Sequence, residues 1–169
     1  MEIGNSKKET KIAEPVVYTL GTSNRSIEEF VALLKKWKIV CAVDVRRFPH
    51  SHFSHFNKDA LLHHLTAEGI EYAHLGDPLG GYRKRGYIRH TKGREFKRAL
   101  EALKRMAREG ALCIFCAERL PERCHRRFIA DSLSREGWQV THIISTNKTR
   151  CPSQQNLLFL RKTSEIRER

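Results

Sequence analysis

Residues 96–115, FKRALEALKRMAREGALCIF, contain in one stretch the two patterns that set the fold. Apolar residues recur at the three- and four-residue spacing of a helix with one buried face, at Phe96, Leu100, Leu103 and Ala107. Glu109-Gly110 follows, and glycine directly after a helix takes the left-handed conformation that stops it. The apolar run ALCIF comes next, as is typical of a buried parallel strand. The stretch therefore predicts a helix, a tight turn and a strand.

The same helix, glycine and strand pattern occurs twice more, at Glu68-Gly69 and Glu136-Gly137. Five short strands are expected in all, at VVYTL (16–20), IVCAVDV (39–45), IEYAHL (70–75), ALCIF (111–115) and WQVTHII (138–144). A helix is expected over 26–37, where Ser26 and Glu29 have the spacing of a capping box. This alternation predicts an α/β fold: a single three-layer domain with a mostly parallel sheet of about five strands and helices on both faces.

The domain is expected to span residues 15–146, between an N-terminal extension (1–14) and a basic C-terminal tail (147–169) with weaker patterns. The 169-residue chain is long enough for one core. No apolar run reaches the roughly 20 residues of a membrane span, so we expect no membrane partner and a cytoplasmic protein. Five cysteines form no evident disulfide framework, which favours free thiols.

The charge is strongly basic, since 32 Lys and Arg residues stand against 19 Asp and Glu residues and give a net charge of +13. Between Tyr82 and Arg108 there are eleven basic and two acidic residues, which accounts for most of this excess. A charge-rich surface also occurs as an adaptation to heat. We favour a polyanionic partner, with DNA expected and RNA as the alternative.

Polar segments follow all five expected strands, at GTSNR (21–25), DVRRFPHSHFSHF (44–56), HLGDPLGGYRKRGY (74–87), CAERLPERCHRR (116–127) and STNK (145–148). Ligands bind at the carboxyl edge of open α/β sheets. We therefore expect these loops to converge on one site.

Several of these motifs resemble the family known as domain of unknown function 488. The resemblance runs from about Tyr18 to about Ile144, and its most specific part is CAE followed by PERCHR. Matching positions are Gly21, Ser23, Arg25, Asp44, Arg46, Pro49, Gly80, Gly81, Cys116, Glu118, Cys124, His125 and Arg126. Thr22 stands where the family motif has histidine, so no role of that histidine carries over. The resemblance implies a small α/β domain and these motif residues, without a family-wide reaction.

The segment CAERLPERCHRR admits three interpretations. Cys113, Cys116, Cys124 and His125 suggest a zinc site, but adjacent Cys124 and His125 would project from different faces of a helix, so we expect no metal and no cofactor. Cys116 is a possible nucleophile, because the nearby arginines would lower its thiol pKa; the alternative is a half-buried structural cysteine. A helix beginning at Pro121 would instead form a phosphate pocket with His125 and Arg126.

Two carboxylates and several aromatic residues complete the candidate site. Asp44 and Glu118 are candidate catalysts, or alternatively they orient arginines through salt bridges. Phe48, Phe53 and Tyr82 are candidates for stacking on bases. The phosphate or nucleic-acid contacts are expected from Ser23, Arg25, Arg46, Arg47, Arg83, Lys84, Arg85, His125 and Arg126.

These residues favour an enzyme that acts on nucleic acid. A metal-independent DNA glycosylase fits best, because a flipped base needs an aromatic slot, a carboxylate and phosphate contacts. The first alternative is a module that binds nucleic acid or phosphate without catalysis. The second is a Cys116-dependent enzyme on a small anionic substrate.

Overall fold

The computed structural model describes residues 15–152, which form one six-stranded sheet in the order β3-β2-β4-β1-β5-β6. The strands are β1 (Val16–Gly21), β2 (Cys41–Asp44), β3 (Glu71–His74), β4 (Leu112–Cys116), β5 (Gln139–Ser145) and β6 (Lys148–Arg150). Strands β1 to β5 run parallel, and β6 runs antiparallel to β5. The predicted α/β fold is confirmed, and each of the five predicted strands overlaps an observed one.

The sixth strand lies in the segment that we interpreted as the C-terminal tail. Residues Lys148–Arg150 are all exposed and show no apolar alternation, so the sequence gives no strand signal there. The described sheet therefore continues past residue 146 to Arg150. The N-terminal extension (1–14) and residues 153–169 of the tail lie outside the described residues.

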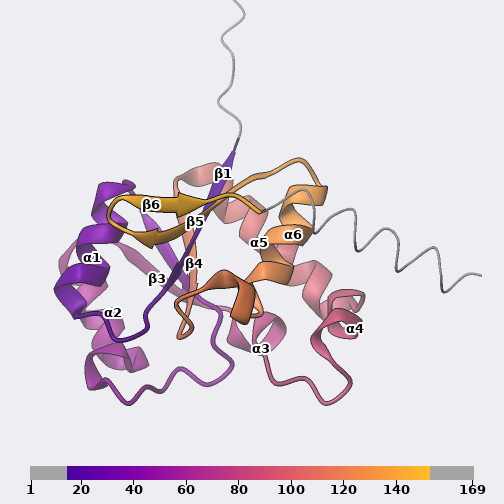
Figure 1. Ribbon diagram of the computed structural model, residues 1–169, viewed down its shortest axis with the longest axis horizontal. Coiled ribbons are helices and arrows are strands. Elements are labelled where there is room, and N and C mark those ends of the chain that lie inside the picture. The colour runs from indigo at the N-terminus through magenta and orange to yellow at the C-terminus, as the bar shows by residue number, and fades with distance from the viewer. Residues whose placement is uncertain (1–14, 153–169) are drawn as a thin grey trace, which may run out of the picture.

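Helices cover both faces of the sheet. The longer ones are α1 (Ile27–Lys36), α2 (Lys58–Ala67), α5 (Arg94–Glu109) and α6 (Arg126–Arg135). Helices α1 and α2 lie on one side of the sheet, and α5 and α6 lie on the other (Figure 1). The connections contain the short helices α3 (Gly76–Leu79) and α4 (Tyr87–Thr91) and the 3-10 turns η1 (Ser54–Phe56) and η2 (Pro121–Arg123). Within residues 15–152, no helix has the length and apolar character needed to span a bilayer.

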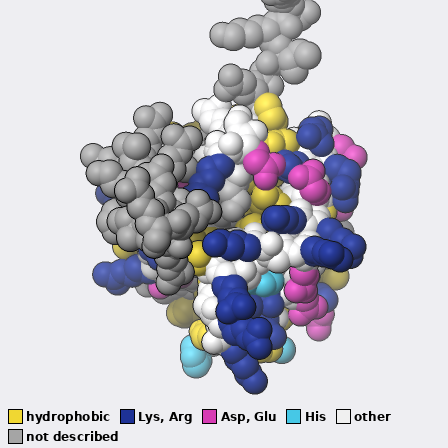
Figure 2. Space-filling model, turned by 90° about the vertical axis from the view of Figure 1, so that its right-hand side faces the viewer, with side chains coloured by type: hydrophobic (Ala, Val, Ile, Leu, Met, Phe, Trp, Pro, Cys, Tyr) yellow, Lys and Arg dark blue, Asp and Glu magenta, His cyan; other side chains and the backbone are white. Residues whose placement is uncertain are grey.

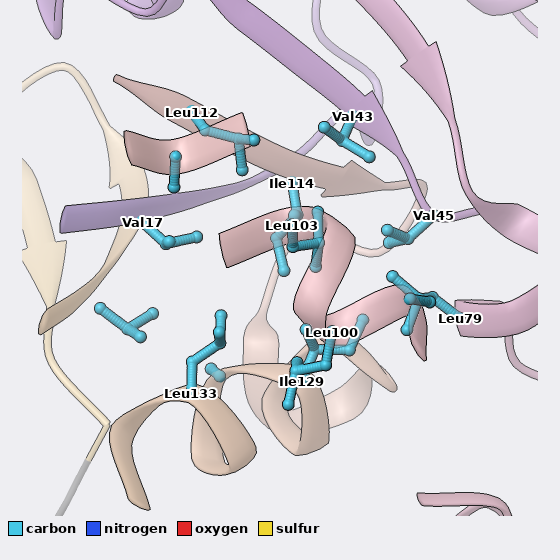
Figure 3. Close-up of a cluster of buried hydrophobic side chains, with 14 of the residues drawn as sticks. Val17, Val43, Val45, Leu79, Leu100, Leu103, Leu112, Ile114, Ile129 and Leu133 are labelled. Carbon is cyan, nitrogen blue, oxygen red and sulfur yellow. The ribbon is translucent and has the colours of Figure 1, made fainter. Parts of the chain in front are cut away.

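Each face of the sheet has its own hydrophobic core. On one face, Leu100 and Leu103 of α5 and Ile129 of α6 pack against strand residues such as Val17 and Ile114 (Figure 3). On the other face, α1 and α2 pack on β1, β2, β4 and β5, with Phe30 edge-on to Phe115 at 5.3 Å. The apolar stripe predicted in residues 96–107 is confirmed as the buried face of α5.

The local signals at helix ends are mostly confirmed. The Ser26 hydroxyl accepts a hydrogen bond from the Glu29 amide at 3.1 Å, as a helix cap should. Gly69 (φ 71°) and Gly137 (φ 87°) adopt the predicted left-handed conformation. The same prediction is wrong for Gly110, whose φ of 171° is extended. A Cβ at Gly110 would lie 2.5 Å from Val40 Cγ2, so this glycine provides space for a neighbouring side chain.

The topology places a crevice beside β2 and β4. These strands are neighbours, but the chain leaves β2 towards α2 on one face and leaves β4 towards α6 on the other. Where connections from adjacent parallel strands diverge in this way, the loops open a crevice at the carboxyl edge. This is where the candidate site lies.

The α5 core generates a stability prediction. Leu103 is fully buried between α5 and the sheet, and Leu103→Ala is expected to lower the free energy of unfolding by about 2–5 kcal/mol because it leaves a cavity. Leu62→Ala in α2 is the matched control, since that side chain is 44% exposed and should cost under about 1 kcal/mol. Urea unfolding measures both free energies. Equal losses of stability in the two variants would contradict the burial of Leu103 between α5 and the sheet.

Candidate functional site

A cleft of about 840 Å³ opens at the carboxyl ends of β2 and β4. Its lining comes from three segments: residues 46–50 after β2, residues 81–87 after α3, and residues 116–128 between β4 and α6. The predicted convergence is therefore observed for the loops that follow β2, β3 and β4. The loops after β1 and β5 do not line this cleft.

The loop after β1 supports the cleft wall from behind. The amides of Thr22 and Ser23 donate hydrogen bonds to the carbonyls of Cys116 (2.8 Å) and Ala117 (2.9 Å). A Cβ at Gly21 would lie 2.1 Å from the Glu118 carbonyl oxygen, so only glycine allows this approach. The Ser23 hydroxyl lies 3.4 Å from the Asn24 side chain and does not line the cleft, which places it away from its predicted phosphate contact.

Two of the predicted phosphate-binding arginines are buried instead. Arg25 is 2% exposed and donates to the carbonyls of Gly21 (3.1 Å) and Ile144 (2.6 Å), and it pairs with Glu29. Arg126 is fully buried and donates to the Glu118 carbonyl at 2.6 Å. Both guanidinium groups hold main-chain segments together, and this structural role replaces the predicted phosphate contact.

Arg126 is also the first member of a buried polar chain. Its Nη1 donates to the Thr19 hydroxyl at 3.0 Å, and Thr19 Oγ1 lies 2.8 Å from His142 Nδ1. A hydroxyl that accepts from Arg126 can also donate its own hydrogen to an unprotonated Nδ1. Burial, reinforced by the charge of Arg126, lowers the pKa of His142 to about 4.

Asp44 is a fully buried partner of Arg46. Its carboxylate accepts from Arg46 Nε (2.8 Å), Nη2 (2.6 Å) and the Arg46 amide (3.0 Å), and from the Tyr72 hydroxyl (2.9 Å). Arg46 also donates to the Phe56 carbonyl at 2.9 Å. Burial, together with the Asp44 charge, raises the pKa of Tyr72, so this hydroxyl stays a donor. The geometry supports the alternative in which Asp44 orients an arginine at the cleft.

Glu118 has a different position from Asp44. It is exposed, it lines the cleft, and one carboxylate oxygen lies 3.3 Å from the Leu120 amide. Of the two predicted acids, Glu118 is therefore the one whose carboxylate can reach a bound molecule.

A second hollow of about 450 Å³ adjoins the cleft and is strongly basic. Arg47 and Tyr82 line both spaces. Five basic residues line the hollow: Arg47, Arg83, Lys84, Arg85 and Arg89. Lys and Arg side chains gather on the face of the molecule that carries α4 and α6 (Figure 2). The structure thus brings the predicted cations Arg83, Lys84 and Arg85 together, and Arg89 of α4 lies beside them.

The aromatic candidates separate into two groups. Phe48 (64% exposed) and Tyr82 (87% exposed) line the cleft, whereas Phe53 lies outside it beside His55. Tyr87 and Phe128 form a stacked pair in the cleft wall, with ring centroids 5.3 Å apart, that was not predicted from the sequence. Tyr87 begins α4 and Phe128 lies in the first turn of α6, so the two rings meet only through the tertiary fold.

The segment 116–127 is arranged differently from our prediction. Pro121 begins the one-turn helix η2, and α6 begins only at Arg126. Cys124 is extended between them (φ −125°, ψ 149°), so its side chain is not in helical register with His125. The prediction that these two side chains diverge is therefore wrong: Cys124 Sγ lies 3.7 Å from His125 Nδ1.

The cysteines have distinct environments. Cys116, the possible nucleophile, is 3% exposed, lines the cleft and has its sulfur in contact with that of Cys124. Cys113 is fully buried in the core on the opposite face, and burial raises its pKa to about 12. His125 is bonded to the main chain, since its Nε2 lies 3.0 Å from the Val45 carbonyl oxygen, and this ring nitrogen is not free for the predicted phosphate contact. Burial lowers the pKa of His125 to about 4.

One protein-family model matches most of the described domain. The family model described as Domain of unknown function DUF488 matches residues 26–133, from the start of α1 to near the end of α6. The chain belongs to this family. The match leaves out Gly21, Ser23 and Arg25, and it contains all three segments that line the cleft. No curated protein and no solved structure matches the chain.

The structural role of Asp44 as the partner of Arg46 can be tested by measuring the free energy of unfolding. Asp44→Asn is expected to lower the free energy of unfolding by about 3 kcal/mol, because it leaves the buried Arg46 without its charged partner. The matched control Asp59→Asn, at an exposed position of α2, should cost under about 1 kcal/mol. Urea unfolding provides the measurement. A stable Asp44→Asn protein that has lost catalytic activity would restore the catalytic role predicted from the sequence.

His142 generates a pH prediction. The folded pKa of about 4 lies below the ordinary value of about 6.5, so the folded protein binds fewer protons than the unfolded chain between these values. The stabilisation is complete above about pH 6.5 and is lost as the pH falls towards 4, by at most about 3 kcal/mol. His142→Asn keeps an acceptor for Thr19 and should reduce this loss, measured by urea unfolding at pH 7 and pH 4.5. The exposed control His63→Asn should follow the wild type; parallel curves for all three proteins would refute the assignment.

Proposed function

We propose that this protein acts on nucleic acid and removes a base by hydrolysis, with Glu118 as the carboxylate. The observation that carries the proposal is the combination at one cleft: an exposed carboxylate in the wall, exposed Phe48 and Tyr82 at the opening, and the adjoining basic hollow. A base taken out of its stack needs an aromatic surface, and the strand on either side of it needs cations. DNA is the proposed substrate.

The strand would be bound along the basic hollow. Lys84, Arg85 and Arg89 are exposed there, whereas Arg47 and Arg83 also donate to the carbonyls of Tyr82 and Gly80. The exposed cations are available for phosphate oxygens, and the two bonded arginines fix the loop that presents them. Tyr82 lies between hollow and cleft, so a base stacked on it is next to the cleft that contains Glu118.

The chemistry needs one carboxylate near the sugar. Glu118 accepts a proton from a water molecule as the water oxygen bonds to C1′, the bond from C1′ to the base nitrogen breaks, and the base leaves and takes up a proton from solvent. The negative charge of Glu118 also stabilises the cationic sugar that forms as this bond lengthens. Asp44 contributes indirectly, because it orients Arg46 in the cleft wall.

The test is an incubation of labelled DNA with the pure protein in the presence of a chelator. The panel contains duplexes and single strands with uracil, oxidised pyrimidines, hypoxanthine or an abasic site, followed by alkali and a sizing gel. We expect a break at one class of base, and Glu118→Gln should slow it by about 100- to 10,000-fold while a gel shift shows unchanged affinity. The matched control is Glu109→Gln, an exposed acid at the end of α5 that precedes β4.

Two results would indicate a different function. A salt-sensitive gel shift without any break would indicate a binding module, whose affinity Lys84→Gln with Arg85→Gln should reduce. A break that Cys116→Ser abolishes and Glu118→Gln does not would indicate the thiol-dependent alternative.

A further inference from the structure

We propose that Cys116, Cys124 and His125 bind a zinc ion in the wall of the cleft. The sulfur atoms of the two cysteines and Nδ1 of His125 all lie within 4.8 Å of one another. In a tetrahedral zinc site, bond lengths of about 2.3 Å to sulfur and 2.0 Å to nitrogen put a sulfur and a nitrogen ligand about 3.5 Å apart. The observed separation of Cys124 Sγ and His125 Nδ1 is 3.7 Å.

His125 is oriented as a metal ligand. Its Nε2 lies 3.0 Å from the Val45 carbonyl, and a carbonyl oxygen only accepts, so Nε2 carries the hydrogen. In the neutral ring this leaves the lone pair on Nδ1, the atom that faces the two sulfurs. A main-chain carbonyl bonded to the far nitrogen is the usual partner that fixes a histidine ligand.

The surroundings keep room for the ion and favour a thiolate. A Cβ at Gly81 would lie 3.2 Å from His125 Nδ1, so any larger residue there would press on the coordinating atom. The main-chain amide of Arg126 donates to Cys124 Sγ at 3.5 Å, an N–H to sulfur bond that stabilises the thiolate form. Two sulfur ligands and an imidazole favour zinc over magnesium or calcium.

A disulfide explains the two cysteines less well. Their Cα atoms are 7.8 Å apart, and cysteines more than about 7 Å apart at Cα cannot be joined without movement of the main chain. The two sulfur atoms are in contact in the structure, and two sulfur ligands of one tetrahedral zinc lie roughly 3.8 Å apart, so binding of the ion would move them apart, which the wide Cα spacing allows. The cysteines lie on separate elements, with Cys116 at the end of β4 and Cys124 after η2, so the ion would fix the intervening loop that carries Glu118.

The fourth position of the ion would face the cleft, because all three ligands line it. Three protein ligands with one open position are the arrangement of zinc sites that bind a water molecule or a substrate oxygen. The ligand class is therefore water or an anionic oxygen, such as that of a phosphate. The inference does not depend on the proposed base removal, in which zinc takes no step.

The test measures the metal directly in the full-length protein. The protein is produced with zinc in the medium, purified with a reductant and no chelator, and analysed for zinc per chain. We expect about one equivalent in the wild type, and Cys116→Ser or Cys124→Ser should lower zinc affinity by more than about tenfold. Cys151→Ser, at an exposed cysteine outside the cluster, is the matched control and should retain the metal.

Cobalt substitution of the wild type gives a readout that needs no variant to fold. Cobalt should produce the absorption of sulfur-to-cobalt charge transfer and of tetrahedral coordination. The proposal is overturned if reduced wild type binds neither metal, if both serine variants keep full zinc, or if peptide mapping of the zinc-grown protein finds a disulfide between Cys116 and Cys124. Since the DNA assay is run with a chelator, its failure leaves the zinc result unaffected.

Discussion

The buried guanidinium of Arg126 connects the parts of the molecule on which the cleft depends. It bonds to the Glu118 carbonyl after β4, to the Thr19 hydroxyl in β1 and, through that hydroxyl, to His142 in β5. Its Nε has no acceptor among the described residues, and the cost of burying the charge is offset by the bonds that Nη1 and Nη2 donate to Thr19 and to the Glu118 and Arg119 carbonyls. The loop between β4 and α6 therefore has one defined path.

That path explains why polar residues in the family motifs divide into two kinds. Arg25, Asp44 and Arg126 are buried and maintain the geometry of loops, whereas Glu118 faces solvent. The division follows from what each side chain bonds to, because Arg25 and Arg126 donate to main-chain carbonyls and Asp44 accepts from Arg46. A motif residue is consequently no evidence of ligand contact by itself.

The sequence predicted the layers well because apolar periodicity is a local property. The α5 stripe and the strand at 112–116 are examples, and both are confirmed. It failed where tertiary contacts decide the outcome. Gly110 is extended and makes room for Val40, which is distant in sequence, and β6 is paired with the edge of β5. The same holds for the candidate site. The sequence identified the loops that line the cleft, but it could not show which arginines are buried or that Cys124 lies next to His125.

The position of β1 in the sheet affects the order in which the chain can fold. Val17 is flanked by Leu112 of β4 and Val140 of β5, so the first strand has neither of its partners until late in synthesis. Strands β2 and β3 can pair earlier, since only η1 and α2 lie between them in the chain. Until β4 emerges from the ribosome, the apolar side chains of β1 have no sheet to join, and an unpaired apolar strand is where a nascent chain mispairs or recruits a chaperone. Completion of the cleft, whose wall lies between β4 and α6, thus coincides with burial of the first strand.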